Sequence, residues 1–306
     1  MIPLHRTARV HPRQPMAPAA RPETPEPGWY RALAEGLDFA RRRLSGDYHV
    51  DEFGFDADLT DHVLHPLLRP LYRVWFRVET IGIQHIPADG GALVVANHSG
   101  TLPLDCLMTA LAIREQHPAG RHLRMLAPDV VFRTPLLASL ARKSGQTMAC
   151  LPDAERLLRA GELVGVWPEG LTGLGKRYPD RYKLQRFEGG GLIATALRTQ
   201  TPIVPCSIVG AEEIYPMIGD LKPLARLLGL PYFPVTPLFP LLGPLGLIPL
   251  PSKWYIEFAP PLRTGQYDPA RAEEPTLVFH LADQVREIIQ QTLYRLLARR
   301  PHPFLS

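Results

Sequence analysis

The chain has 306 residues, of which 45% are hydrophobic and 21% are charged. This composition supports a sizeable folded core, in one large domain or two small ones. A formal net charge of +4 suits an anionic membrane surface or an anionic ligand, and it is too small to indicate a nucleic-acid-binding protein.

The N-terminal region divides at residue 27. Residues 1–27 contain seven prolines and scattered arginines without an apolar run, which predicts a disordered tail and not a signal peptide. Residues 28–74 predict N-terminal amphipathic helices. In the first helix, 28–45, apolar side chains share one face and three arginines lie near its end.

A second apolar and basic segment covers residues 58–76. Pro66 and Pro70 are expected to break or kink any helix there. Both N-terminal segments have the character of helices that lie in a membrane interface, and both could equally pack on the core. The sequence leaves these two alternatives open.

From about residue 75, apolar strand-like runs alternate with helix-like segments. The predicted strands are 75–83, 92–97, 123–128, 146–150, 162–167, 202–209 and 253–259. The predicted helices are 103–116, 133–143, 152–160, 187–199 and 275–300. The alternation predicts an α/β domain over residues 75–270, with a mixed, mostly parallel sheet flanked by helices, and then a C-terminal helix within residues 271–306.

Residues 227–252 contain no charged side chain, although they are long enough to span a membrane. Seven prolines exclude a spanning helix, because each removes a backbone hydrogen bond that hydrocarbon cannot replace. We expect an extended apolar loop. It either lines an acyl-chain channel or dips into the bilayer surface, or it is a buried connector on the sheet.

The first candidate catalytic pair is His98 and Asp105. An apolar strand ends at Asn97 and His98, where ligands collect in open α/β sheets. Gly100 permits a tight turn and a proline at 103 favours a helix start, which places Asp105 in the first helical turn with an ionised carboxylate. Imidazole can then act as a general base oriented by that carboxylate. The plain alternative is an ordinary strand-end histidine beside a helix-start acid.

Further candidates surround this pair. Asn97, Ser99 and Gly100 are predicted substrate contacts, and the backbone N–H groups of Ser99 and Gly100 are candidate donors to an oxyanion. A second strand ends in Trp-Pro-Glu-Gly at residues 167–170. There Glu169 either positions a polyol or supports the site by hydrogen bonding, and Gly170 allows close backbone approach.

The two strand-end motifs, with the stretches 203–213 and 253–258, resemble the glycerolipid acyltransferase family of lysophosphatidate (1-acylglycerol-3-phosphate) acyltransferase-like enzymes. The matches keep the family's order over roughly residues 75–265. The family's usual motif has four residues between His and Asp, whereas six intervene here. The arginine that commonly follows the family's Pro-Glu-Gly-Thr is absent, so Arg133, Lys176 and Arg177 are predicted to supply positive charge for the acceptor.

The resemblance implies a function in phospholipid biosynthesis. His98 would take a proton from an acceptor hydroxyl, which attacks the thioester of acyl-CoA or acyl-carrier protein without an acyl-enzyme. The predicted acceptor is lysophosphatidate, and the alternative is a neutral or non-phosphate lipid alcohol. We expect no cofactor, no nucleic-acid partner, and a peripheral or monotopic place on the cytoplasmic face of the membrane.

Three other classes of protein share some feature with this sequence. Residues 170–176 fit a phosphate-loop pattern, but Arg177 stands where magnesium binding needs Ser or Thr. A serine hydrolase lacks its Gly-x-Ser-x-Gly motif in this sequence. A non-catalytic membrane-surface binding protein remains an alternative.

Three isolated cysteines predict reduced thiols and no metal centre: Cys106, Cys150 and Cys206.

Overall fold

The computed structural model describes residues 28–99, 102–133, 135–170, 173, 176–185, 187, 190–227 and 232–304. The chain separates into two compact units, residues 1–46 and 47–306. The predicted disordered tail lies outside the described residues, as does Gly100. In the first unit the predicted helix is present as α1 (Gly28–Ser45), with two arginines in its last turn.

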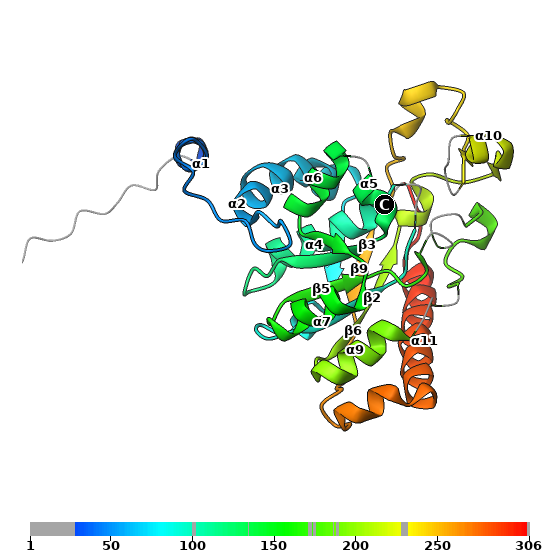
Figure 1. Cartoon of the computed structure of the whole chain (residues 1–306). Helices are drawn as coiled ribbons and strands as arrows, with labels where there is room; N and C mark the ends of the chain where they lie inside the picture. The colour runs from blue at the N-terminus through cyan, green and yellow to red at the C-terminus, as the bar shows by residue number, and fades with distance from the viewer. Residues whose placement is uncertain are drawn as a thin grey trace, which may run out of the picture. The chain divides into compact units, whose positions relative to one another are not determined.

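The second unit is built on a seven-stranded sheet in the order β1-β9-β6-β2-β5-β3-β4 (Figure 1). Its strands are β1 (Glu79–Ile81), β2 (Ala92–Ala96), β3 (Leu123–Ala127), β4 (Gln146–Met148), β5 (Leu163–Val166), β6 (Ile203–Val209) and β9 (Tyr255–Phe258). Only the β6–β9 pairing among these is antiparallel. The predicted mixed, mostly parallel sheet is therefore confirmed.

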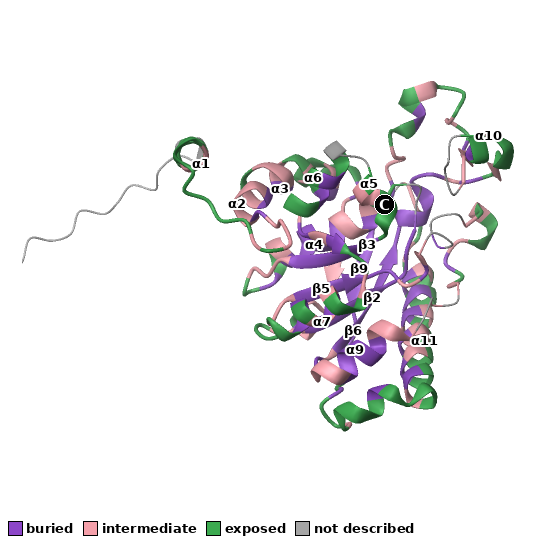
Figure 2. Cartoon of the chain, viewed as in Figure 1, coloured by how far each residue is buried: buried purple, intermediate pink, exposed green. Residues whose placement is uncertain are grey.

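Both faces of the sheet are covered, which explains the continuous apolar strands. Along β2, Val94 and Ala96 pack into one apolar cluster, whereas Leu93 and Val95 pack into the other. One face is covered by α4 (Leu104–Gln116), and the other by α7 (Leu151–Arg159), α9 (Gly191–Thr199) and α11 (Pro275–Arg299). Figure 2 shows the strands buried between outer helices with exposed surfaces.

The segment before the sheet stays helical despite its two prolines. It runs through α2 (Ala57–Leu59), a π-turn (Thr60–Leu64), α3 (His65–Pro70) and a second π-turn (Leu71–Trp75). The two prolines therefore do not break the helix. The backbone hydrogen-bond pattern instead widens in the two π-turns, and these wider turns accommodate the N–H groups that proline lacks. Tyr72 and Phe76 are buried in the core while Leu67 and Val74 remain exposed, so one face of the segment packs on the protein.

Helix boundaries elsewhere differ in detail from the prediction. The predicted helix 133–143 is α6 (Pro135–Lys143), and a short helix that was not predicted, α5 (Asp129–Arg133), precedes it. The predicted loop 227–252 follows α10 (Lys222–Leu227) and contains a two-residue strand, β8 (Pro234–Val235), paired with β7 (Gly219–Asp220). No helix in the described part of the chain is both long and apolar enough to cross a bilayer.

Candidate active site

The parallel strands bring three chain segments to one edge of the sheet. His98 follows β2, Glu169 follows β5, and a turn of residues 211–213 follows β6. Strands β5, β2 and β6 are neighbours and run in the same direction, so their carboxyl ends lie side by side. This is where open α/β sheets bind ligands.

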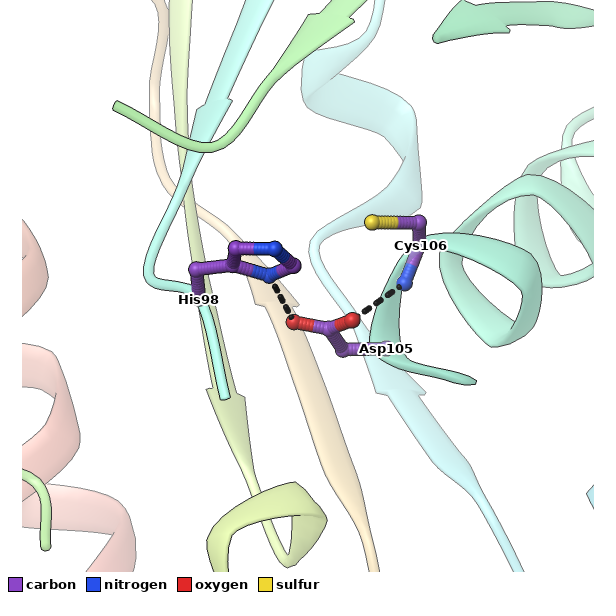
Figure 3. A group of neighbouring side chains, drawn as sticks. All are labelled: His98, Asp105 and Cys106. Atoms are coloured by element: carbon purple, nitrogen blue, oxygen red, sulfur yellow. Dashed lines mark hydrogen bonds and ion pairs between the residues drawn. The ribbon is translucent and has the colours of Figure 1, made fainter. Parts of the chain in front are cut away.

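His98 and Asp105 form a hydrogen-bonded pair at this edge. The ring Nδ1 lies 2.7 Å from Asp105 Oδ2. Figure 3 marks this contact with a dashed line. Asp105 is the second residue of α4 and its side chain is fully buried, whereas the His98 side chain is 10% exposed. With Nδ1–H donating to the carboxylate, Nε2 keeps its lone pair and can accept a proton.

Backbone donors fix the Asp105 carboxylate in place. Its Oδ2 also accepts the Ser99 N–H at 3.0 Å, and its Oδ1 accepts the Cys106 N–H at 2.9 Å. The Ser99 N–H is thus already engaged, and the prediction that it donates to an oxyanion is wrong for this geometry. The Ser99 Oγ is buried and has no hydrogen-bond partner among the described residues.

Asn97 joins two strands. Its Nδ2 donates to the Ile208 carbonyl at 3.0 Å, and its Oδ1 accepts the Ile208 N–H at 2.7 Å. The residue is fully buried, so its amide faces protein and not a substrate. In contrast to the predicted substrate contact, Asn97 holds the end of β2 against β6 and so positions the residue that follows it.

Glu169 supports the His98–Asp105 pair by accepting a hydrogen bond from the main chain of His98. Its Oε1 accepts the His98 backbone N–H at 3.0 Å, while its Oε2 accepts the Gln185 N–H at 2.8 Å and Lys176 Nζ at 3.1 Å. Its side chain is fully buried. Of the two roles predicted for Glu169, these contacts match support by hydrogen bonding.

Lys176 links Glu169 to a second buried acid. Its Nζ donates to Glu212 Oε1 at 3.0 Å, and Glu212 Oε2 accepts the Tyr182 N–H at 2.9 Å. Burial raises the pKa of Glu212 to about 7. Burial opposes the Lys176 charge, but Glu212 and Glu169 outweigh it and raise the pKa of Lys176. With a side chain 5% exposed, Lys176 is neither the solvated loop residue nor the open anion contact considered from the sequence.

Two glycines shape the same corner. Gly170 has φ of 54°, a left-handed conformation that favours glycine. At Gly173, a Cβ atom would lie 2.7 Å from Glu169 Cβ and 3.1 Å from His98 Cβ. Gly173 is not among the predicted site residues; its signal in the sequence is the glycine-rich stretch 170–176, whose glycines are better explained by a loop over the active site than by a phosphate loop.

The remaining predicted cations lie apart from the pair in the described contacts. Arg133 is 74% exposed and pairs with Asp129 on its own helix at 2.7 Å. Arg177 is exposed. Among the described residues, no hydrogen bond or ion pair joins either arginine to His98 or Asp105. The structure therefore does not bring them together with the catalytic candidates.

Cys106 completes a cluster with the pair. Potential ligand atoms of His98, Asp105 and Cys106 lie within 4.8 Å of one another (Figure 3). Burial, and then the charge of Asp105, raise the pKa of the Cys106 thiol well above its usual value. Both Asp105 oxygens already accept hydrogen bonds, from His98, Ser99 and Cys106, so the arrangement fits a base with its orienting carboxylate.

A more distant segment approaches the pair. Burial raises the pKa of Tyr232 to about 12, and the charge of Asp105 adds to the effect. Tyr232 lies just before β8, in the segment predicted to be an extended apolar loop. The same segment is attached directly after the turn that carries Glu212, through the bonds of Leu247 to Tyr215 and of Leu250 to Ile214.

Comparison with known proteins agrees with this geometry. The sequence profile of the acyltransferase family matches residues 77–209, which include both strand-end motifs. Uncharacterized proteins of Mycobacterium bovis and Mycobacterium tuberculosis are each 59% identical over 274 residues, covering 90% of this chain and 76% of theirs. The chain belongs to the acyltransferase family.

Two more distant matches carry names. A human protein named DGAT1/2-independent enzyme synthesizing storage lipids is 25% identical over 223 residues, covering 71% of this chain and 61% of that protein. The crystal structure of the 1-acyl-sn-glycerophosphate (LPA) acyltransferase PlsC from Thermotoga maritima superposes with a TM-score of 0.52 at 20% identity, covering 90% of this chain and 99% of that one. At that identity the structural match shows a shared fold.

Proposed function

We propose that the protein is an O-acyltransferase that moves a fatty acyl group from acyl-CoA or acyl-carrier protein to a hydroxyl of a glycerolipid, with lysophosphatidate as the lead acceptor. The observation that carries the proposal is the 2.7 Å contact between His98 Nδ1 and Asp105 Oδ2 at the carboxyl edge of the sheet. The acyltransferase family match covers these residues and supports it.

The proposed reaction is a direct transfer. His98 Nε2 takes the proton of the acceptor hydroxyl as its oxygen bonds to the thioester carbon, while Asp105 stabilises the imidazolium. The tetrahedral intermediate then loses the thiolate, which receives the proton from His98. The products are the acylated lipid and free CoA or carrier-protein thiol. General-base assistance of this kind contributes about 10²–10⁴-fold in rate.

A second acceptor class is a neutral or otherwise non-phosphate lipid alcohol. Lys176, the cation bonded to Glu169 in the described part of the site, is already paired with two buried carboxylates. A phosphate headgroup would have to compete with them. The human relative's name, which refers to storage lipids, is consistent with this alternative.

The test is thiol release by purified protein supplied with acyl-CoA and a lysolipid panel. Lysophosphatidate is compared with monoacylglycerol and diacylglycerol, and the His98→Ala variant is the matched control. We expect release with one of these acceptors and its loss in the variant while the fold persists. Release by His98→Ala at the wild-type rate would refute the mechanism, and covalent labelling by a fluorophosphonate would instead indicate a serine hydrolase.

We also propose a peripheral or monotopic place on the cytoplasmic membrane face, where the acyl donors are available. The segment 57–75 supports this, because Leu67 and Val74 are exposed on it, and so are Arg69 and Arg73, which both pair with Glu115. Liposome binding without thiol release for any acceptor would favour a non-catalytic membrane-binding protein. Fractionation of cells and washing of their membranes with high salt would locate the protein.

A further inference from the structure

Aliphatic side chains are concentrated on one exposed part of the second unit. We use the name apolar protrusion for the described residues 218–227 and 232–250, which include α10 and a turn at Gly243–Leu247. Figures 1 and 2 show these elements beyond the edge of the sheet. Its exposed aliphatic side chains are Ile218, Leu221, Leu227, Leu241, Leu242, Leu245, Leu247 and Ile248. Leu227 and Leu241 are more than four-fifths exposed, at 81% and 84%.

The apolar protrusion has a defined internal structure. Thr236 is buried, and its Oγ1 accepts the Phe239 N–H at 2.9 Å. The Phe233 and Phe239 rings pack with centroids 5.4 Å apart. A Cβ at Gly246 would lie 2.6 Å from the Leu238 carbonyl oxygen, so the chain packs closely on itself. The leucines are thus presented outward by a folded segment.

The base of the apolar protrusion is fixed beside the candidate active site. Tyr215 Oη donates to the Leu247 carbonyl at 2.6 Å, and the Leu250 N–H donates to Ile214 at 2.9 Å. Both anchors come directly after the turn that carries Glu212. Tyr232, whose pKa responds to the Asp105 charge, comes from the same segment. A molecule bound on the apolar protrusion would therefore lie close to the catalytic pair.

The charged side chains of the apolar protrusion indicate what kind of surface it contacts. Among the described residues of the apolar protrusion, the charged side chains are Lys222, Arg226 and Asp220, and the Asp220 carboxylate already accepts the Phe233 N–H at 2.9 Å. Lys222 and Arg226 are exposed on α10 beside Leu227. Cations flanking exposed aliphatic side chains match an anionic headgroup layer above hydrocarbon.

A protein partner fits less well. In a symmetric contact between two copies, the same cations would lie on both sides of the interface. Protein interfaces are also enriched in aromatic side chains, whereas the exposed apolar side chains here are leucine and isoleucine.

We propose that the apolar protrusion inserts its leucines into an anionic lipid bilayer and so holds the His98–Asp105 pair close to the membrane surface. The proposal rests on the proposed function only for its link to catalysis, since docking itself can be measured without any reaction. It assigns the membrane contact to residues that follow the predicted catalytic motifs, far along the chain from the N-terminal helices.

The test is flotation of the full chain with vesicles of phosphatidylcholine containing about 30% phosphatidylglycerol, a common anionic lipid. The variant Leu241→Ser/Leu242→Ser/Leu245→Ser removes the apolar contact and should weaken binding by on the order of tenfold or more. Lys222→Gln/Arg226→Gln should weaken it by roughly fivefold for each cation, and only on anionic vesicles. Phe279→Ser, at a 55% exposed position on α11, is the matched control and should bind as wild type does.

Circular dichroism and sedimentation velocity without vesicles accompany each variant. The proposal is overturned if the triple-serine variant binds like Phe279→Ser, or if wild type self-associates and the triple-serine variant does not, which would indicate an interface between two copies. Thiol release with a short-chain acceptor below its micelle concentration separates the two proposals. Docking without release for any acceptor refutes the enzyme and leaves docking standing, whereas release without docking refutes this inference alone.

Discussion

Glu169 Oε1 accepts the backbone N–H of His98 at 3.0 Å, so the residue after β5 fixes the position of the residue after β2. The ring of His98 is held by Asp105 and its main chain by Glu169. Two separate carboxylates therefore orient one imidazole, and each can be altered without touching the other.

Removing the ring's partner should stop catalysis and preserve the fold. Asp105→Asn leaves no anion to stabilise the imidazolium, and we expect kcat to fall by about 10²–10⁴-fold. Steady-state thiol release measures it. Thr109→Val is the matched control, because Thr109 Oγ1 donates to the Asp105 backbone carbonyl at 2.8 Å and not to its carboxylate, so its loss leaves the carboxylate in place. Equal activity in Asp105→Asn and wild type would contradict the assignment.

Removing the Glu169 carboxylate, which accepts the His98 N–H, should lower kcat more than it changes KM. In Glu169→Ala the His98 N–H loses its acceptor and the imidazole can shift, which costs on the order of 10²-fold for a displacement near 1 Å. Glu169→Gln keeps an oxygen for that N–H, so its loss should be smaller. Initial rates over a range of acceptor concentrations separate kcat from KM. A pure KM effect in both variants would instead favour the predicted contact between Glu169 and a polyol.

Gly173 should be intolerant of a single methyl group. Gly173→Ala places a Cβ within 2.7 Å of Glu169 Cβ and displaces either that residue or His98. We expect a loss of kcat comparable to that of Glu169→Ala. Gly265→Ala is the control, since the nearest atom to its Cβ is Gln200 Oε1 at 3.8 Å. Full activity in Gly173→Ala would contradict this prediction, because it would show that Glu169 and His98 can move to accept the methyl group without loss of function.

Glu212 should make the protein less stable as the pH rises from about 4.5 to about 7. Its pKa is about 7 in the folded state against an ordinary value of 4.5, so the folded state binds more protons between these values. The free energy of unfolding then falls from pH 4.5 to about 7, by up to about 3 kcal/mol from this group. Urea unfolding of wild type and Glu212→Gln measures it. The difference between the two should change over this pH range and level off above it; a flat difference would contradict the assignment.

The C-terminal helix ends in a buried ion pair. Arg300 pairs with Glu213, and their side chains are 4% and 1% exposed, respectively. Arg300 also donates to the Lys253 carbonyl at 3.1 Å. Arg300→Met leaves a buried acid without its cation and should lower the free energy of unfolding by about 3–5 kcal/mol. Arg300→Met/Glu213→Gln should recover much of that loss in urea unfolding. Equal losses in the single and double variants would show that the unpaired charge is not the cause.

The strands were predictable where burial on both faces enforces an apolar run. Strands β2, β5 and β6 are buried along their whole length, and their sequence boundaries agree within one or two residues. The antiparallel pairing of β7 with β8 was missed, because strands of two residues carry no periodicity. The π-turns around Pro66 and Pro70 were missed because proline alone signals a break. The proposed domain boundaries stay predictions.

The contact between His98 and Asp105 was predictable from local signals, and the contacts that support it were not; the catalytic role of the pair stays a prediction. A strand end followed by a proline and an acid places His98 and Asp105 on facing elements. The contacts of Lys176 with Glu169 and Glu212 join segments up to 36 residues apart, so no local spacing reveals them. Arg133 was chosen from the resemblance, and its helix lies after β3, where it pairs with Asp129.

Six residues lie between His98 and Asp105, yet the hydrogen bond between them has ordinary length. The turn can therefore lengthen as long as the strand end and the helix start keep their places. A search that demands a fixed interval between the two residues would overlook chains like this one. Relatives of this kind are better recognised by a histidine closing one buried strand and an acid opening the next helix.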